Sequence, residues 1–150
     1  MNAHQDLINL YSGRILALAA SIPNTERLGD PDGSAKKRSP LCGSTVTVDI
    51  KQQNGVVTAF GQDVKACALG QSAASVIGAN VVGCTIGDIC KLRDELRAML
   101  RSGGPVPSAP FSELEVLLPA AEFRNRHASI LLCAEATAEA LEMATNSHCA

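Results

Sequence analysis

A strand-and-turn signature near the middle of the chain constrains the fold most. Residues 45–50 alternate between polar and apolar side chains, which places Val46, Val48 and Ile50 on one face of an extended strand. Asn54-Gly55 follows shortly after, and this dipeptide favours the two-residue turn of a β-hairpin. The pattern therefore predicts a half-buried strand that turns back into an antiparallel partner.

Two further strands are expected around this one. Residues 56–64 read as the return strand, and a short leading strand is expected around residues 36–38. Three strands with one apolar face need helices to cover that face. The expected helices are residues 7–22, ended by Pro23, residues 67–82, one opened by Thr85 and Asp88, a short one from Ser112 to Pro119, and residues 129–144. We predict an α+β fold, with residues 1–150 forming a single domain.

Composition and charge exclude several classes of protein. The net charge is −2, and no basic tract is longer than Lys36-Lys37-Arg38, so nucleic acid is not an expected partner. Residues 66–87 carry no charged side chain, yet polar residues and glycines interrupt them. We interpret this stretch as a buried helix and its connection, and not as a membrane span. A cytoplasmic protein with no membrane partner is expected.

The six cysteines are spread along the chain, at positions 42, 67, 84, 90, 133 and 149. None forms a CxxC pair, which excludes zinc-ribbon and thioredoxin-like sites. The chain also begins without a secretion signal, so a disulfide framework is not expected in a reducing compartment. Cys84 and Cys90 are expected to be buried, and Cys149 to lie on a frayed tail. Any metal site must then be assembled from distant parts of the chain.

Three of these cysteines are candidates for chemistry, although each could also be a small buried residue. Cys42 lies between Pro40 and Gly43 in a predicted exposed turn. Cys67 opens the uncharged helix, where the positive end of the helix dipole stabilises a thiolate. Cys133 lies on the last predicted helix, one turn after Ser129 and on the same face.

Two segments of the sequence resemble the family of iron–sulfur scaffolds that includes SufU, IscU and the N-terminal part of NifU. The segments are residues 39–44, Ser-Pro-Leu-Cys-Gly-Ser, and residues 67–75, Cys-Ala-Leu-Gly-Gln-Ser-Ala-Ala-Ser. In that family a Cys-Gly-Asp turn precedes the middle strand, and a second cysteine opens a helix about 25 residues later. Cys42 and Cys67 are 25 residues apart. The resemblance covers residues 5–145, and the segment between Gly103 and Pro119 is similar to an insertion of SufU-like members.

The sequence departs from the family pattern in two places. Ser44 stands where the family has an aspartate that is associated with metal binding and with cluster release. The third cysteine of the family aligns either with Cys133 or, one turn earlier, with Ser129. We favour Cys133 as the working thiol. The histidine that precedes the third cysteine in IscU-like members is replaced by Leu132, and His127 substitutes for it only if the chain folds back.

The resemblance implies a function. A cysteine desulfurase would pass persulfide sulfur to Cys133 or Cys67, and a [2Fe–2S] cluster would form with iron on Cys42, Cys67 and Cys133 before transfer to apo iron–sulfur proteins. Soft thiolates suit zinc as well, so a zinc-dependent sulfur acceptor is the first alternative and a metal-free interaction module the second. We prefer a scaffold to a sulfurtransferase, and expect a monomer or weak dimer.

Overall fold

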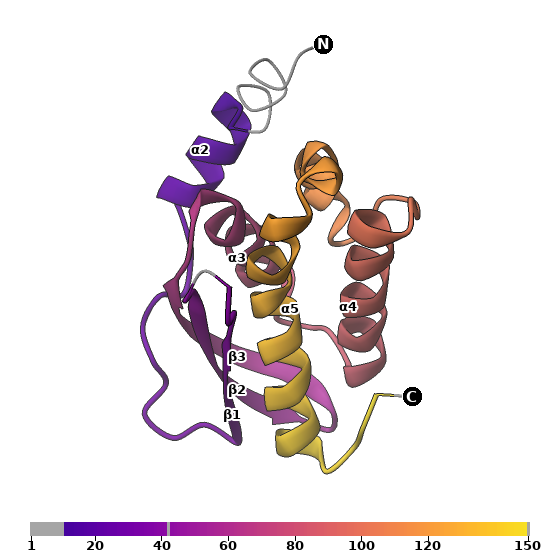
Figure 1. The fold of residues 1–150 in the computed structure, drawn as a ribbon. Coiled ribbons are helices and arrows are strands. Elements are labelled where there is room, and N and C mark those ends of the chain that lie inside the picture. Colours follow the sequence, from indigo (N-terminus) through magenta and orange to yellow (C-terminus); the bar gives the residue numbers. More distant parts are fainter. Residues whose placement is uncertain (1–10, 42, 150) are drawn as a thin grey trace.

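The computed structural model describes residues 11–41 and 43–149 of the chain (Figure 1). The part of the first predicted helix that precedes residue 11, and the candidate ligand Cys42, lie outside the described residues. In chain order the elements are helix α2 (Gly13–Ala20), strands β1 (Gly33–Arg38), β2 (Thr45–Gln53) and β3 (Val56–Lys65), helices α3 (Ala68–Asn80) and α4 (Ile86–Arg101), the 3₁₀ helix η1 (Ser112–Glu122), and helix α5 (Arg124–Thr145).

The three strands form one antiparallel sheet in the order β1-β2-β3. Val46, Val48 and Ile50 are buried on one face, as the alternation predicts. Asn54 and Gly55 have φ values of 54° and 81°, the positive values that a type I′ hairpin turn requires. The predicted α+β fold with a three-stranded antiparallel sheet is confirmed.

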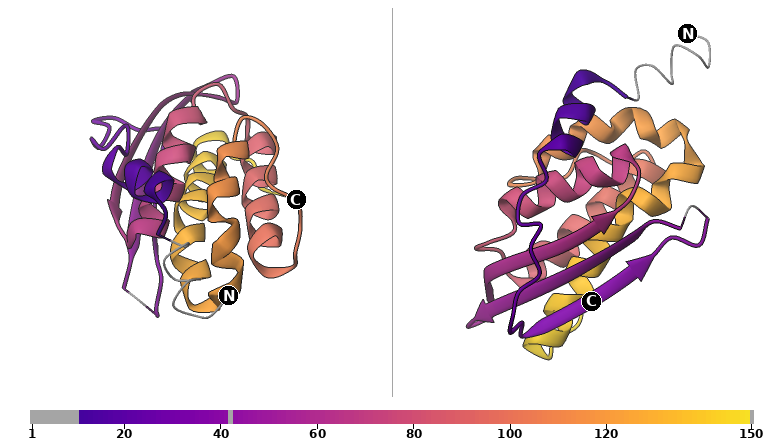
Figure 2. Two further views of the ribbon diagram at one scale, coloured as in Figure 1. Left: turned by 90° about the horizontal axis from the view of Figure 1, so that it is seen from above. Right: turned by 90° about the vertical axis from the view of Figure 1, so that its left-hand side faces the viewer.

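Helices α3, α4 and α5 lie on one side of the sheet, whereas α2 lies beyond one end of it and packs on α3 (Figure 1 and Figure 2). Helix α5 packs directly on β1 and β2, while α3 and α4 flank it. Gly33 permits this close approach, because a Cβ there would collide with the backbone oxygen of Ala140. Helix α4 begins with the predicted capping box, in which Thr85 and Asp88 bond each other's backbone N–H groups. Helix α5 is therefore the central element that connects the sheet to the remaining helices.

The opposite face of the sheet is covered by the segment that leads into β1. Asp49 points to this side and is fully buried, and its carboxylate accepts hydrogen bonds from Arg27 Nε (2.6 Å), Leu28 N (3.0 Å) and Ser34 Oγ (2.6 Å). Burial alone would raise the pKa of Asp49, but these hydrogen bonds and the Arg27 charge together lower it. Asp49 thus fastens the leading segment to the sheet.

We expect Asp49→Ala to lower the free energy of unfolding by about 3 kcal/mol at pH 7, because several hydrogen bonds to a buried charge are lost. The folded pKa lies below the unfolded value of about 3.9, so this stability is present above pH 4 and is lost as the pH falls through the folded pKa. Urea unfolding at pH 7 and pH 3 measures the difference. Asp30→Ala, at a side chain that is 98% exposed, is the control and should change little.

Three predicted helix boundaries are wrong. The first helix is not continuous over residues 7–22, because α2 begins at Gly13 after the N-cap Ser12, whose hydroxyl accepts a hydrogen bond from Ile15 N (3.4 Å). Pro119 does not end its helix, because η1 continues to Glu122 in successive 3₁₀ turns, which bond differently from the α-helical interior that proline disrupts. Helix α5 begins at Arg124 and not at Ser129, because its first turn is polar and shows no apolar periodicity. Ser129 consequently lies more than one turn inside α5.

The cysteine predictions are also corrected. Cys90 is not buried as a free thiol but forms a disulfide with Cys149, with the two Cα atoms 5.5 Å apart. The tail turns back toward α4 after Asn146, which adopts a left-handed conformation, and Glu142 accepts a hydrogen bond from Cys149 N (2.8 Å). Cys149 is thus not frayed, and the expectation of reduced cysteines fails for this pair. Cys84 is buried, as predicted.

The uncharged stretch of residues 66–87 forms α3 and its connection to the start of α4. Within the described ranges, none of the helices combines the length and apolar character needed to cross a bilayer.

Candidate functional site

A tight turn joins β1 to β2 at one end of the sheet. Its backbone is held by hydrogen bonds from Ser39 N to Ser44 O (2.8 Å) and from Gly43 N to Ser39 O (2.9 Å). Gly43 has a φ of 73°, a conformation that glycine adopts at no steric cost. Leu41 is 75% exposed. The turn is thus exposed, as the sequence predicts. It ends at the buried Ser44, whose backbone oxygen accepts the hydrogen bond from Ser39.

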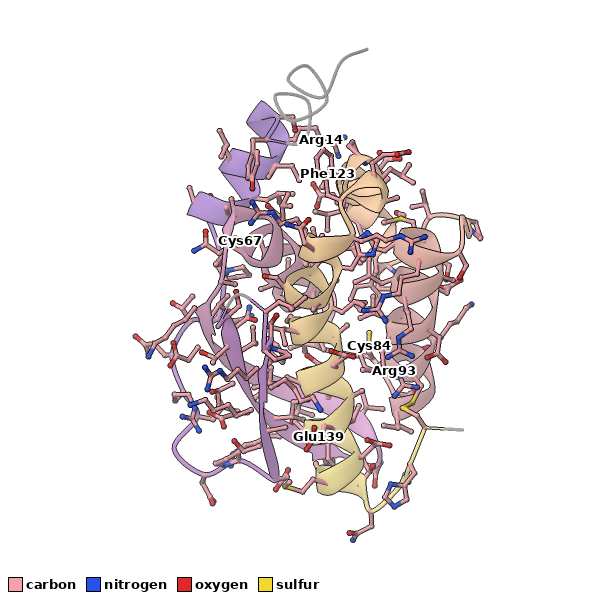
Figure 3. The ribbon with its side chains drawn as sticks, viewed as in Figure 1. Arg14, Cys67, Cys84, Arg93, Phe123 and Glu139 are labelled. Carbon is pink, nitrogen blue, oxygen red and sulfur yellow. A yellow bond between two sulfur atoms is a disulfide. The ribbon has the colours of Figure 1, made fainter. Side chains whose placement is uncertain are left out.

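Cys67 lies at the N-cap of α3, immediately after β3 ends (Figure 3). Its backbone is extended (φ −68°, ψ 170°), and its side chain makes no capping hydrogen bond to the first turn of α3. The side chain is half-buried, and the first turn of α3 contains no acidic residue that would repel a thiolate. Among the three free cysteines of the described residues, Cys67 is the only one that is not buried.

Ser129 of α5 connects Cys67 to the turn before β2. Its hydroxyl lies 3.5 Å from the Cys67 Sγ and donates to the Ser44 Oγ at 3.3 Å. A hydroxyl has one hydrogen, so when Ser129 donates to Ser44 the Cys67 thiol is the donor to Ser129. When Cys67 loses its proton, Ser129 can rotate and donate to the thiolate instead. Cys67, Ser129 and Ser44 are called the thiol–hydroxyl cluster below.

Cys133 is not part of this cluster. It lies one helical turn further along α5, is 1% exposed, and donates to Oε1 of the buried Gln62 at 3.4 Å. Burial raises the pKa of the Cys133 thiol to about 12. In this conformation Cys133 is therefore a protonated core thiol, and of the two residues that compete for the third position it is Ser129 that contacts Cys67.

The hydrogen bond of His127 goes to η1 and not to the cluster. Its ring is buried, and Nε2 donates to the backbone oxygen of Ala120 at 2.9 Å. The described part of the chain brings no group of three or more His, Cys, Asp or Glu side chains into a metal-binding arrangement. A cargo held here would therefore rely on the Cys67 thiolate, on the neighbouring hydroxyls, and on whatever residue 42 adds.

Gln62 is a polar partner that the sequence reading missed. It pairs with Val48 across the sheet and so faces the helices, where its amide Nε2 donates to the backbone oxygens of Ala74 (3.1 Å) and Pro23 (3.2 Å). The alternation of β3 could have predicted this role, because Phe60, Gln62 and Val64 share the inward face of the strand. A polar residue in that register indicates a buried hydrogen-bond partner.

Gly70 sets the distance between α3 and α5 at the cluster. A Cβ at this position would lie 2.8 Å from Ser129 Oγ and 3.0 Å from Ser129 O. We expect Gly70→Ala to destabilise the protein by about 1–3 kcal/mol and to displace Ser129 from Cys67. Gly87→Ala, at an open position of α4, is the matched control and should stabilise by up to about 1 kcal/mol. Thermal unfolding compares the two variants, and an unaffected Gly70→Ala would contradict this packing.

The free thiols should differ sharply in reactivity. A thiol with a pKa near 12 is ionised to about one part in ten thousand at pH 8, and Cys133 is also shielded from reagents. We expect iodoacetamide to modify Cys67 in the folded protein and to reach Cys133 only after denaturation. Peptide mass spectrometry of samples quenched over time measures both rates. Equal rates in the folded state would show that α5 opens readily.

The fold and the cluster together define a class of protein: a small α+β domain with a partly exposed thiol at a helix N-terminus, beside a glycine-containing turn. No family model and no curated protein matches the sequence. Among solved structures, the N-terminal part of a nitrogen-fixing NifU-like protein from Brucella abortus has 39% identity and a TM-score of 0.91, over 94% of this chain and 98% of that one.

Two other solved structures share the fold at low identity. A candidate iron–sulfur cluster assembly scaffold protein for the SUF system, the SufU protein of Fervidobacterium islandicum, is 15% identical with a TM-score of 0.81, over 93% of this chain and 99% of that one. A hypothetical protein is 16% identical with a TM-score of 0.79, over 94% and 99%. The identity and coverage of the Brucella match show that this chain belongs to the NifU/SufU/IscU-like family.

Proposed function

We propose that this chain is an iron–sulfur cluster assembly scaffold. It would accept sulfur from a cysteine desulfurase, hold a transient [2Fe–2S] cluster as cargo, and release it to apo iron–sulfur proteins. The observation that carries the proposal is the contact of Cys67 with Ser129, within a fold shared with NifU-like and SufU proteins. A half-buried thiol beside a hydroxyl combines access for a partner with a hydrogen-bond donor for the thiolate.

The first proposed step is persulfide transfer. The Cys67 thiolate attacks the outer sulfur of the persulfide on the desulfurase, a new S–S bond forms at Cys67, and the desulfurase cysteine leaves as a thiolate. Ser129 can donate to the Cys67 sulfur before attack and return to Ser44 afterwards. Conversion of the transferred sulfur to sulfide takes two electrons, which an external thiol or a protein electron donor would supply.

Binding of the cargo would follow at the same place. We propose Cys42 and Cys67 as its thiolate ligands, since soft thiolates suit iron–sulfur clusters. Cys133 stays a predicted third ligand, and because it is buried one turn from Ser129, it could bind only after α5 shifts. In the described conformation the neighbouring donors are the neutral hydroxyls of Ser44 and Ser129. Such an incomplete set of strong ligands suits cargo that must be released.

A resident zinc ion fits this donor set poorly. Structural zinc sites use four thiolate, imidazole or carboxylate ligands, and hydroxyls do not replace them. His127 is engaged with Ala120, and Ser44 replaces the acidic residue of the family. We therefore favour the scaffold over the zinc-dependent sulfur acceptor. A cytoplasmic setting and a monomer or weak dimer remain our expectations.

Anaerobic reconstitution tests the proposal. The protein is incubated with iron, cysteine and a cysteine desulfurase, and then examined by absorption spectroscopy and by analysis of iron, zinc and acid-labile sulfide. We expect sulfide-to-iron charge-transfer bands with equal amounts of iron and sulfide. A colourless protein that holds zinc and accepts persulfide would instead support the sulfur acceptor, and neither metal nor persulfide would leave an interaction module.

A further inference from the structure

A cavity lined by cationic side chains lies on α4 and α5, apart from the thiol–hydroxyl cluster. It has a volume of about 220 Å³ and is lined by Arg101, Arg124 and His127. That volume is far above the roughly 10–15 Å³ that one water molecule needs, so it leaves room for a small polyatomic ion. Arg101 belongs to the last turn of α4, and the other two residues belong to the first turn of α5. The cavity is thus built by two helices that meet through η1.

The charges around this cavity are not balanced. Neither Arg101 nor Arg124 forms an ion pair with any residue of the described ranges. The first turn of α5 contains no acidic residue and carries Arg124 and Arg126. Cations at this end of a helix are unfavourable, because they repel the positive end of the helix dipole. A bound anion would remove this repulsion.

His127 gives the cavity a fixed wall. Its side chain is almost fully buried, and the hydrogen bond from Nε2 to Ala120 O fixes the ring orientation. Nδ1 of His127 has no hydrogen-bond partner among the described residues. In these residues, every side-chain nitrogen or oxygen that is fully buried has a hydrogen-bond partner, so Nδ1 is not fully buried and is accessible. Because Nε2 carries the proton of the neutral ring, Nδ1 is an acceptor that can bond the P–O–H group of a hydrogen phosphate in the cavity. A buried imidazole of fixed orientation beside two arginines can select among anions better than exposed arginines alone.

We infer that this cavity binds a small phosphate: inorganic phosphate or the phosphate group of a small ester. Guanidinium groups bind phosphate through paired, charge-assisted hydrogen bonds, and two of them match a dianion better than the single charge of a carboxylate. The inference rests on Arg101, Arg124 and His127 and is independent of the function proposed for Cys67. It adds a second ligand site at the N-terminal end of α5, the helix that also carries Ser129.

Isothermal titration of the full chain with phosphate, at constant ionic strength, tests the inference. Inorganic phosphate, adenosine monophosphate and succinate are the probes, and sodium chloride is the blank. We expect saturable one-to-one binding of inorganic phosphate or of the monophosphate, and tighter binding of one would identify the free ion or the ester as the ligand. Heats no larger than those of chloride, or succinate binding as tightly as either phosphate, would overturn the inference.

Variants locate the site. Arg101→Ala and Arg124→Ala should each weaken phosphate binding about tenfold or more, because each removes charge-assisted hydrogen bonds. Arg38→Ala, which removes a guanidinium from exposed β1, is the matched control and should bind as the wild type does. Circular dichroism confirms that all three variants fold, since the replaced arginines are exposed. Unchanged affinity in both cavity variants would overturn the assignment, as would an equal loss in Arg38→Ala.

Discussion

Cys67→Ser is expected to abolish cluster assembly while leaving the fold intact. The substitution replaces one sulfur atom by oxygen at a half-buried N-cap position, where serine is itself a favoured capping residue. It removes the one free, partly exposed thiol of the described residues, and with it the proposed persulfide acceptor and cluster ligand. Reconstitution followed by iron and sulfide analysis should give less than a tenth of the wild-type cluster. Thermal unfolding should shift by no more than a few degrees.

Cys84→Ser is the matched control for this prediction. Cys84 is a free thiol that is buried next to α4, and Figure 3 shows it well apart from Cys67. Burial and the nearby Asp88 carboxylate raise the pKa of Cys84, so it should stay protonated and take no part in sulfur transfer. We expect this variant to assemble the cluster at the wild-type yield, with some loss of stability. Full assembly in Cys67→Ser would contradict the proposed role of Cys67.

Ser129→Cys should convert the site from transient to persistent binding. The new sulfur would lie beside the Cys67 sulfur, where the Ser129 hydroxyl is now 3.5 Å away, and would add a third strong ligand. We expect release of iron or zinc to a chelator to slow by at least tenfold, and transfer of the cluster to an apo-ferredoxin to slow with it. Absorption spectra recorded after addition of the chelator follow both processes.

Thr137→Cys provides the control for the added thiol. Thr137 lies on the same helix as Ser129, two turns further along and fully buried, and it contacts Cys133. A thiol there should not affect metal release, because it is remote from Cys67. If Ser129→Cys released metal as fast as the wild type, or if Thr137→Cys retained it equally well, Ser129 would not be a position that faces the cargo.

Local sequence patterns predicted most of the fold correctly. Strand alternation, the Asn54-Gly55 turn and the Thr85 capping box are short-range signals, and each is present in the structure. The errors arose where such signals were weak. The polar first turn of α5 concealed its start, and Pro119 was read as a terminator in a segment that is 3₁₀. The Cys90–Cys149 disulfide joins residues 59 positions apart, and no local pattern reports such a contact.

The site was predictable only in part, for a geometric reason. Neighbouring residues placed Cys67 at a helix N-terminus and an exposed turn before β2, and the structure has both. The sequence favoured Cys133 over Ser129 for the third position, but neighbouring residues do not distinguish the two, because they lie one turn apart on the same face of α5. That choice depends on how α5 packs against α3, which Gly70 sets by its close contact with Ser129. It also depends on Gln62, which lies on the helix-covered face of β3 and accepts a hydrogen bond from the Cys133 thiol.

The most direct test of the central proposal is to map the persulfide. The wild-type protein is mixed anaerobically with a cysteine desulfurase and cysteine, quenched with an alkylating agent, and digested for mass spectrometry. We predict that the added sulfur is found on Cys67, and that Cys133 is unmodified because its thiol is buried and protonated. Sulfur found on Cys133, with Cys67 unmodified, would contradict the proposed mechanism and show that α5 opens during transfer.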